Sequence, residues 1–240
     1  MKVVKNLKNN KALVTVVCCL HGDELFGLKL FKYLEKRIDY FSGLKIILAN
    51  QKAIAAGKRF LDSDLNRVFP GKLKGDHEEK LAREILKEIG KTKYLLDIHT
   101  TTSDIKMTPV VTNLNKKIRQ VINLTQSREV VKMSKKFASH SMIGQFNNGV
   151  SLEFNFKYAR RQEVLQQTVK LIAALLKGKS KTAKDRKVFQ VDSVIEKNVV
   201  LPSRAKNFVK YKNRYVFLLD EKSYKDMRGF TASNYRYRLI

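Results

Sequence analysis

The sequence of 240 residues is poor in several residue types that mark particular classes of protein. It has no tryptophan, three prolines, four histidines and two cysteines. The cysteines are adjacent, Cys18 and Cys19, and neighbours on a strand point to opposite faces, so they are badly placed to pair with each other. No apolar run approaches the roughly 18–20 residues of a membrane-spanning helix. The first apolar run is followed by His21-Gly22-Asp23-Glu24, where a signal peptide would carry small residues. The sequence therefore predicts a cytoplasmic protein with reduced thiols and no membrane segment.

Acidic residues are also scarce. The chain has 22 of them against 49 lysines and arginines, which gives a net charge of +27. The excess is spread over both halves and is densest in Lys177–Lys187. One interpretation is a surface that binds nucleic acid. The interpretation we favour is a solvated, lysine-rich surface that includes a linker. Either surface attracts small anionic substrates.

The sequence has enough apolar residues to form a hydrophobic core, because 43% of its residues are hydrophobic and 9% are aromatic. That composition excludes wholesale disorder. Apolar β-branched runs alternate with amphipathic segments, which predicts an α/β fold with a mainly parallel, mixed sheet flanked by helices. The expected strands are Ala12–Leu20, Leu44–Ala49, Lys93–Ile98, Met107–Thr112 and Gly149–Phe154. The expected helices are Leu25–Arg37, His77–Ile89 and Glu163–Leu176, with partial helix over Ile118–Phe137.

The pattern changes after about residue 180. Short β-prone segments follow one another without clear helices between them: Val188–Val194, Asn198–Leu201, Tyr215–Leu219 and Tyr235–Ile240. We therefore expect a catalytic domain over residues 1–180 and a small β-rich domain over residues 188–240. A unit of that size is marginal alone, so it should pack on the first domain.

Polar side chains follow the predicted strands at one edge of the sheet. His21 and Glu24 come after the first strand, Asn50 after the second and His99 after the third, and Glu153 lies at the end of a fourth. Ligands of open α/β sheets bind outside the carboxyl ends of the strands. The convergence of these side chains is therefore a stronger signal than any single motif.

His21, Glu24 and the distant His99 form a two-histidine, one-carboxylate set, which is a pattern of catalytic zinc sites with an open fourth position. A zinc ion there would activate water and polarise a carbonyl. Asp97, two residues before His99 on the same strand face, could accept the second ring N–H of that histidine. Backbone hydrogen bonds are the alternative role for each of these residues taken alone.

Glu153 is an acid within an apolar strand, and burial of a carboxylate is costly unless it is paired or functional. Beside a zinc site it would act as a general base, and otherwise it would form an ion pair. The segment Gly57–Gly71 carries Arg59, Asn66 and Arg67. Arginine forks bind carboxylates and stabilise oxyanions, so the segment suits a substrate with a carboxylate, although a solvated loop explains it equally well.

Four motifs in order resemble the succinylglutamate desuccinylase/aspartoacylase family, relatives of the zinc carboxypeptidases, over about residues 12–176. They are His21-Gly22-Asp23-Glu24, Asp64-Leu65-Asn66-Arg67-Val68-Phe69-Pro70-Gly71, Asp97-Ile98-His99-Thr100-Thr101 and Ser151-Leu152-Glu153. The resemblance implies a zinc-carboxypeptidase-like fold ending in a small β domain, with one zinc on His21, Glu24 and His99. It also implies Glu153 as general base, Arg59 as the group that polarises the carbonyl, and Asn66, Arg67 and Tyr224 as substrate contacts.

The sequence departs from the family pattern at three places. Asn50-Gln51 stands where the family has Asn-Pro, and Phe154-Asn155 where it has Val-Gly after the glutamate. Aspartoacylase has an arginine about ten residues before that glutamate, which reads a second carboxylate, whereas this chain has Ser141-Met142-Ile143-Gly144. Arg160 or Arg161 are the candidates to replace it. N-acetylaspartate is therefore not the expected substrate.

The sequence thus predicts a zinc-dependent hydrolase that cleaves the amide bond of an N-acyl amino acid or a similar small carboxylate. The first alternative is a carboxypeptidase-like hydrolase of peptides, which would use the same arginine for a free carboxylate. A nucleic-acid-binding protein, the alternative from a different class, predicts salt-dependent binding without a metal. Aromatic residues interleaved with basic ones would support that class. The densest basic run, Lys177–Lys187, has none, although Tyr211–Tyr215 and Tyr235–Arg238 do interleave them. A homodimer is compatible with all three hypotheses.

Overall fold

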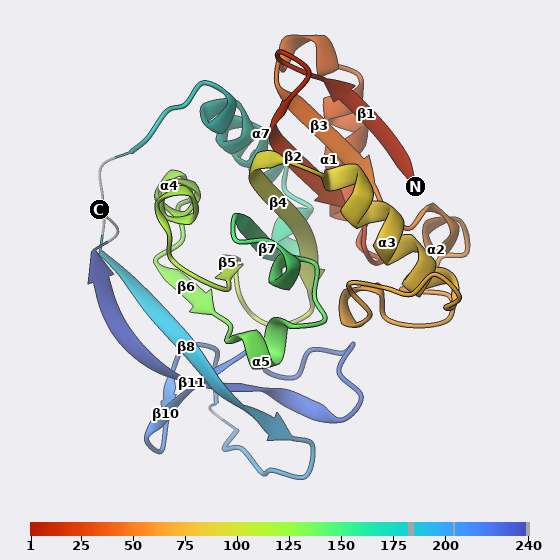
Figure 1. Cartoon of the computed structure of the whole chain (residues 1–240). Helices are drawn as coiled ribbons and strands as arrows, with labels where there is room; N and C mark the ends of the chain where they lie inside the picture. The colour runs from red at the N-terminus through yellow and green to blue at the C-terminus, as the bar shows by residue number, and fades with distance from the viewer. Residues whose placement is uncertain (182–184, 204, 239–240) are drawn as a thin grey trace.

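The computed structural model describes residues 1–181, 185–203 and 205–238. Its strands form one mixed sheet in the order β1-β3-β2-β4-β7-β5-β6-β8-β11-β10-β9 (Figure 1). The strands are β1 (Lys2–Asn6), β2 (Ala12–Cys18), β3 (Leu44–Leu48), β4 (Thr92–Thr101), β5 (Met107–Val111), β6 (Glu129–Lys132), β7 (Gly149–Asn155), β8 (Asp185–Glu196), β9 (Lys210–Tyr211), β10 (Arg214–Phe217) and β11 (Met227–Arg238).

The helices lie on both faces of this sheet. The α-helices are α1 (Leu25–Glu35), α2 (Gln51–Ala55), α3 (His77–Ile89), α4 (Lys116–Leu124), α5 (Lys135–Ala138), α6 (Phe156–Ala159) and α7 (Gln162–Leu176). Three short 3-10 turns, η1 (Ile38–Tyr40), η2 (Leu65–Arg67) and η3 (Ile143–Gln145), interrupt the loops. The predicted α/β class with a mainly parallel, mixed sheet is confirmed.

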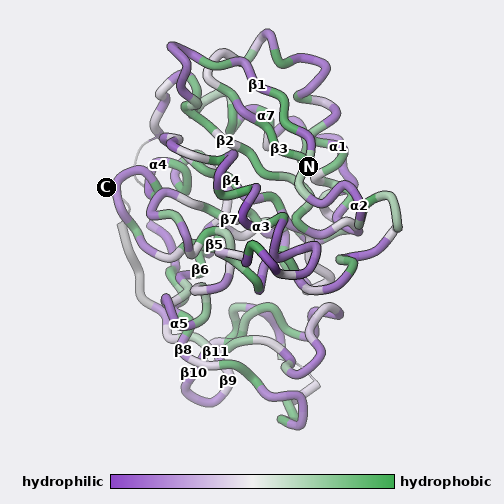
Figure 2. The backbone as a smooth tube through the Cα atoms, turned by 45° about the vertical axis from the view of Figure 1, so that its right-hand side comes forward, coloured by the Kyte–Doolittle hydropathy of each residue, from purple (hydrophilic) through white to green (hydrophobic). Residues whose placement is uncertain are grey.

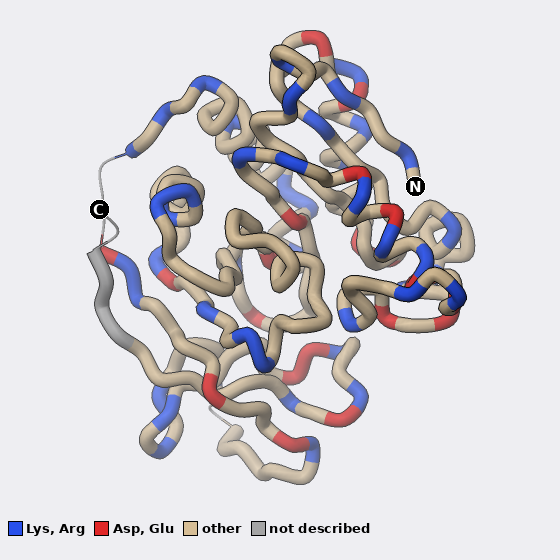
Figure 3. Tube along the Cα trace, in the orientation of Figure 1, with Lys and Arg blue, Asp and Glu red and all other residues tan. Residues whose placement is uncertain are grey.

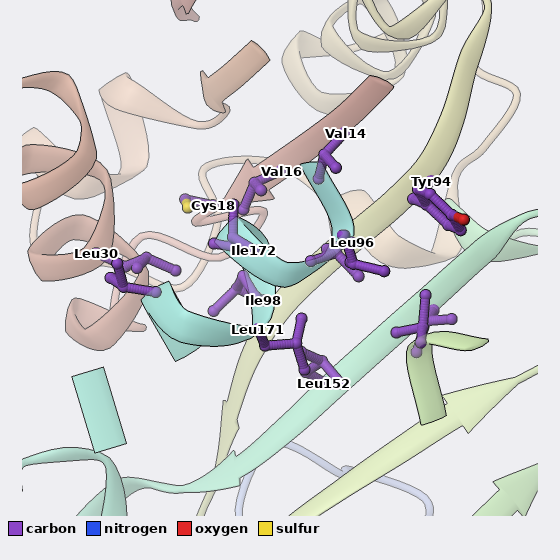
Figure 4. Close-up of a cluster of buried hydrophobic side chains, with 14 of the residues drawn as sticks. Val14, Val16, Cys18, Leu30, Tyr94, Leu96, Ile98, Leu152, Leu171 and Ile172 are labelled. Carbon is purple, nitrogen blue, oxygen red and sulfur yellow. The ribbon is translucent and has the colours of Figure 1, made fainter. Parts of the chain in front are cut away.

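Strands β3, β2, β4 and β7 run parallel and are nearly continuously apolar, because helices cover them on both sides. On one face, Val14, Val16 and Cys18 pack with residues of α1, α4 and α7 in the larger core cluster, part of which is drawn in Figure 4. On the other face, Val17 and Leu95 pack against α3. The more hydrophobic stretches of the chain accordingly follow these central strands (Figure 2).

Helix α3 covers the range predicted from its pattern. Its first residue follows the N-cap Asp76, whose side chain accepts from Glu79 N at 2.8 Å, and the Glu79 side chain accepts from Asp76 N at 3.0 Å. This capping box satisfies two of the free N–H groups at the helix start. The local sequence therefore sets the start of α3 at His77.

Two predicted segments differ in the structure. The stretch Ile118–Phe137 is not one partial helix, because β6 is inserted between α4 and α5; the valines of β6 are buried between β5 and β8. The predicted strand Asn198–Leu201 is wrong. The chain turns there, with Val199 N donating to Glu196 O at 3.2 Å, and the described residues provide no strand that pairs with it. Its apolar residues are therefore left in solvent, with Val200 84% exposed.

The C-terminal strands continue the same sheet, since β8 pairs with β6 in parallel and β11 pairs with β8 along its length. They have their own apolar cluster, in which Phe189, Phe217 and Phe230 are buried. The predicted strand Tyr215–Leu219 corresponds to β10, while Tyr235–Ile240 falls partly on β11 and partly outside the described residues. The division into two domains stays a prediction, and part of its predicted linker also lies outside the described residues.

Lysine and arginine occur along the whole trace, on helices, strands and loops of every layer (Figure 3). In the described part of the chain, no helix has both the length and the apolar character to cross a membrane.

Candidate active site

Three predicted metal ligands converge at the carboxyl ends of β2 and β4. His21 lies just after β2, Glu24 just before α1, and His99 within β4. His21 Nδ1 lies 2.7 Å from Glu24 Oε1, and His99 Nδ1 lies 3.1 Å from Glu24 Oε2. All three side chains are buried, and their ligand atoms lie within 4.8 Å of one another. Two imidazole nitrogens and a carboxylate around one point match the donor set of a zinc site.

The outward-facing nitrogen of each histidine is held by a carboxylate. His99 Nε2 lies 2.8 Å from Asp97 Oδ2, and His21 Nε2 lies 2.9 Å from Asp64 Oδ1. An acceptor on one ring nitrogen keeps the proton there and leaves the other nitrogen free to bind a metal. The contact of Asp97 is the one proposed from the sequence. The sequence analysis did not predict the contact of Asp64 with His21, although Asp64 is the first residue of the motif that contains Asn66.

The electrostatics of the cluster fit a bound cation. Burial favours the neutral form of Glu24, but the neighbouring His99 and His21 outweigh it and hold the pKa of Glu24 below its usual range. Glu24 is therefore an anion inside the protein. A buried anion needs positive charge nearby, and a divalent ion bound by neutral histidines supplies it as well as protonated histidines do. The residues present thus fit zinc.

Glu153 lies in β7 directly beside His99 of β4 in the strand register. Burial raises the pKa of Glu153 to about 7, against an ordinary value of 4.5. A carboxyl group with a pKa near neutrality can both accept and donate a proton, as the role of general base and acid requires.

The segment Gly57–Gly71, here called the arginine-bearing segment, lies against the ligand cluster of His21, Glu24 and His99. Arg59 Nη1 donates to Glu24 Oε1 at 3.3 Å, and Arg59 Nη2 lies 3.2 Å from His21 Nε2. Asn66 accepts a hydrogen bond from Met142 N at 2.9 Å through Oδ1, which ties the segment to the residue that precedes the turn η3. Arg67 is exposed at the pocket rim.

Tyr224 reaches the same pocket from the C-terminal region. Its ring packs edge-on against Phe230 with centroids 5.9 Å apart, and burial raises the pKa of its hydroxyl. Glu221 anchors this segment, because its carboxylate accepts from Thr102 N at 2.6 Å and from Ser223 N at 3.1 Å. The sequence offered no signal for the role of Glu221.

All eight predicted site residues line one cavity of about 300 Å³. They are His21, Glu24, Arg59, Asn66, Arg67, His99, Glu153 and Tyr224. Asn50 does not line it; this side chain caps α2 by accepting from Ala53 N at 3.2 Å. Arg160 and Arg161 do not line it either, and their guanidinium groups lie over the rings of Phe156 and Tyr158.

One side of the cavity is apolar, and sequence reasoning missed it. Its residues come from strands and turns far apart in the chain: Val110, Met133, Phe137, Ile143, Met227 and Phe230. Lys136 is the lysine among the residues that line the cavity, and its Nζ lies 5.6 Å from the centre of the Phe137 ring.

Gly22 next to His21 allows a close approach of backbone. A Cβ at Gly22 would lie 2.4 Å from the carbonyl carbon of Ala53 and 2.5 Å from Lys58 O. We expect Gly22→Ala to cost about 2–3 kcal/mol of unfolding free energy, measured by urea denaturation, because backbone atoms have to move. Gly57→Ala is the control: it has a positive φ of 61° but open space, so about 1 kcal/mol is expected. Equal costs for the two variants would contradict the steric argument.

Comparison with known proteins shows which family the chain resembles. The family model described as succinylglutamate desuccinylase/aspartoacylase catalytic domain matches residues 10–178. A probable aspartoacylase of Acaryochloris marina is 30% identical over 122 residues, which are 44% of this chain and 40% of that protein. An N-acyl-aromatic-L-amino acid amidohydrolase (carboxylate-forming) of Xenopus laevis is 34% identical over 111 residues, 40% of this chain and 36% of that protein.

The match thus spans 40% or less of the length of these two curated relatives. Among solved structures, murine aminoacylase 3 superposes with a TM-score of 0.77 over 96% of this chain and 98% of the other, at 17% identity. The succinylglutamate desuccinylase of Chromobacterium violaceum gives a TM-score of 0.73 at 16% identity, over 95% of this chain and 86% of the other. These superpositions confirm the fold expected from the resemblance. Because the family model matches well over half of the sequence, the chain belongs to the succinylglutamate desuccinylase/aspartoacylase family.

Proposed function

We propose that this protein is a zinc-dependent hydrolase that cleaves the amide bond of a small N-acyl amino acid. The observation that carries the proposal is the convergence of His21, Glu24 and His99 beside Glu153 in one cavity. The outer nitrogens of both histidines are held by carboxylates, as they are in catalytic zinc sites. Membership of a family whose curated relatives include named deacylases supports the reaction class.

The side chains divide the chemical work among them. Bound zinc would be held by His21, Glu24 and His99 and would supply a Lewis acid that polarises the acyl carbonyl. Glu153 accepts a proton from the attacking water and passes it to the amide nitrogen, so that the amine leaves neutral. Arg59 donates hydrogen bonds to the carbonyl oxygen as negative charge develops on it. Arg67 binds the carboxylate of the amino acid at the rim.

The substrate side chain that the cavity suits best is apolar. Ile143 stands ten residues before Glu153, at the place where aspartoacylase has an arginine, and it is 4% exposed. It lies in η3, directly after Met142, whose N–H donates to Asn66, so the side chain of an amino acid held by Asn66 and Arg67 has this apolar wall beside it. A second carboxylate placed there would lose its hydration without a buried cation as partner.

We therefore expect N-acetyl-leucine and N-acetyl-phenylalanine to be hydrolysed with a kcat/KM at least about tenfold above that of N-acetylaspartate. The measurement is release of free amine by the zinc-loaded protein, with a metal-chelated sample as control. Preference for N-acetylaspartate would contradict the apolar assignment and point to Lys136 as the second cation. No hydrolysis of any N-acyl amino acid would overturn the proposed function.

The two alternative functions make different predictions for the same preparation. A carboxypeptidase-like hydrolase would release amino acids from peptides faster than from N-acetyl amino acids. A nucleic-acid-binding protein would bind DNA or RNA without metal, and its affinity would fall steeply with salt. The spread of basic residues over the described chain, rather than over one groove, gives no support to that alternative (Figure 3).

A further inference from the structure

Glu78 is the second residue of α3, and its side chain has no exposure to solvent. Its carboxylate accepts four hydrogen bonds, two on each oxygen. Asn50 Nδ2 and Leu61 N donate to Oε1 at 3.0 and 2.8 Å, while Asp62 N and Ser63 N donate to Oε2 at 3.0 and 3.3 Å. Burial opposes ionisation, but these donors outweigh it and keep the pKa of Glu78 below its usual value. Glu78 is therefore a buried anion with its hydrogen-bonding capacity filled.

The three backbone donors belong to one short stretch, residues 61–63, between the functional groups of the arginine-bearing segment. Arg59 precedes it and contacts Glu24. Asp64 follows it and holds His21. Arg67 comes three residues later at the pocket rim. The conformation of residues 61–63 thus determines where these side chains lie.

We propose that Glu78 is a positioning residue for the candidate active site, because its carboxylate fixes residues 61–63 and thereby places Arg59 and Arg67 around the cavity. This inference rests on the proposed function. Replacement by glutamine keeps the shape but turns one acceptor oxygen into an amide nitrogen, which would face two donors. At least two of the four hydrogen bonds are lost, and buried N–H groups are left unsatisfied. The segment then samples other conformations.

A double-mutant cycle tests this coupling. We expect Glu78→Gln to lower kcat/KM about 100-fold in the parent, the size of effect that misplacing catalytic groups can have. In the Arg67→Ala background the same change should lower kcat/KM less than about tenfold. The guanidinium of Arg67, one of the groups that Glu78→Gln displaces, is already absent in that background. At saturating zinc, the zinc content should stay at about one per chain, since the three ligands lie outside residues 61–63.

Glu79 provides the matched control, because it is the next residue in sequence and equally part of the first helical turn. It bonds Asp76 N and, at 2.7 Å, the Nζ atom of Lys72, and has no contact with residues 61–63 among the described hydrogen bonds. Glu79→Gln should change kcat/KM less than about threefold in either background. Equal effects of Glu78→Gln in the two backgrounds would overturn the positioning role and leave Glu78 as a residue of general stability.

Hydrogen exchange separates this inference from the proposed function. In Glu78→Gln, the amides of residues 59–67 should exchange at least about tenfold faster, while the central strands remain unchanged. Unchanged exchange of residues 59–67, or a rise over the whole chain, would overturn the inference. If the parent hydrolyses no N-acyl amino acid, the proposed function fails, yet exchange still decides the role of Glu78. Should Glu78→Gln not fold, Glu78→Asp, which keeps the charge but shortens the reach, carries the same measurements.

Discussion

Replacing His99 by alanine is expected to remove bound zinc from the protein and to abolish measurable amide hydrolysis. The parent should hold about one zinc per chain, because two histidines and one glutamate make up the three protein ligands of a single catalytic zinc ion. The buried Glu24 then keeps His21 as its partner in metal binding, while Arg59, which lies 3.3 Å from its carboxylate, and Thr100 N still donate to it. Loss of a ligand should weaken metal binding by more than the roughly 10–100-fold that loss of an outer hydrogen-bond partner costs.

The measurement is zinc content after gel filtration, together with zinc affinity from competition with a chelator. Asp97→Asn and His140→Ala complete the series. Asp97→Asn removes the charge behind His99, so a 10–100-fold loss of affinity is expected, while hydrolysis at saturating zinc largely remains. His140 lies outside the ligand group, with Nδ1 3.0 Å from Phe69 O, and its replacement should leave zinc unchanged. Full zinc content in His99→Ala would place the metal elsewhere and overturn the ligand set.

The clustering of His21, Glu24 and His99 could be predicted because it depends on local sequence and on one general property of parallel sheets. The runs that form β2 and β4 are apolar enough to identify the strands, and the polar residues that end them must meet at one edge. The range of α3 was predicted equally well, because apolar residues at helical spacing indicate a helix over His77–Ile89. Where a short local pattern fixes both the element and its boundary, sequence and structure agree.

The apolar wall of the cavity could not be predicted in the same way. Val110, Phe137 and Phe230 come from β5, α5 and β11, and the pairing of β8 with β6 and of β11 with β8 brings the last of them near the others. That pairing depends on β6, a strand of four residues within a segment that was expected to be partly helical. Contacts between short, distant segments leave no periodic signal in either one.

The role of Glu78 could not be predicted from the sequence either. In the sequence it is one of several acidic residues at the start of a helix, where acidic residues are favoured by the helix dipole alone. Its burial and its four donors follow from how the loop before α3 folds back over the helix end. A residue with an ordinary local explanation gives no reason to look for a further role.

Glu153→Gln should retain zinc and fold but lose roughly 10²–10⁴-fold in kcat, since the amide can neither accept the proton of water nor deliver one to the leaving nitrogen. Its place in β7 beside His99 is set by the strand register, so the isosteric change should leave the ligand cluster unaltered. Zinc content and the midpoint of thermal unfolding are the controls. A loss of less than about tenfold would overturn the assignment of the general base.

The pH profile gives an independent signature of the same group. A general base works only when deprotonated, so kcat/KM should fall as the pH drops through the pKa of Glu153. Burial raises that pKa to about 7 from an ordinary 4.5, and a bound cation lowers it again. The acidic limb of the profile is therefore expected between these two values. Glu153→Gln should lack this limb, because no titrating carboxyl remains at that position. A variant that retains the limb would assign the titration to another group and remove Glu153 from the proton transfer.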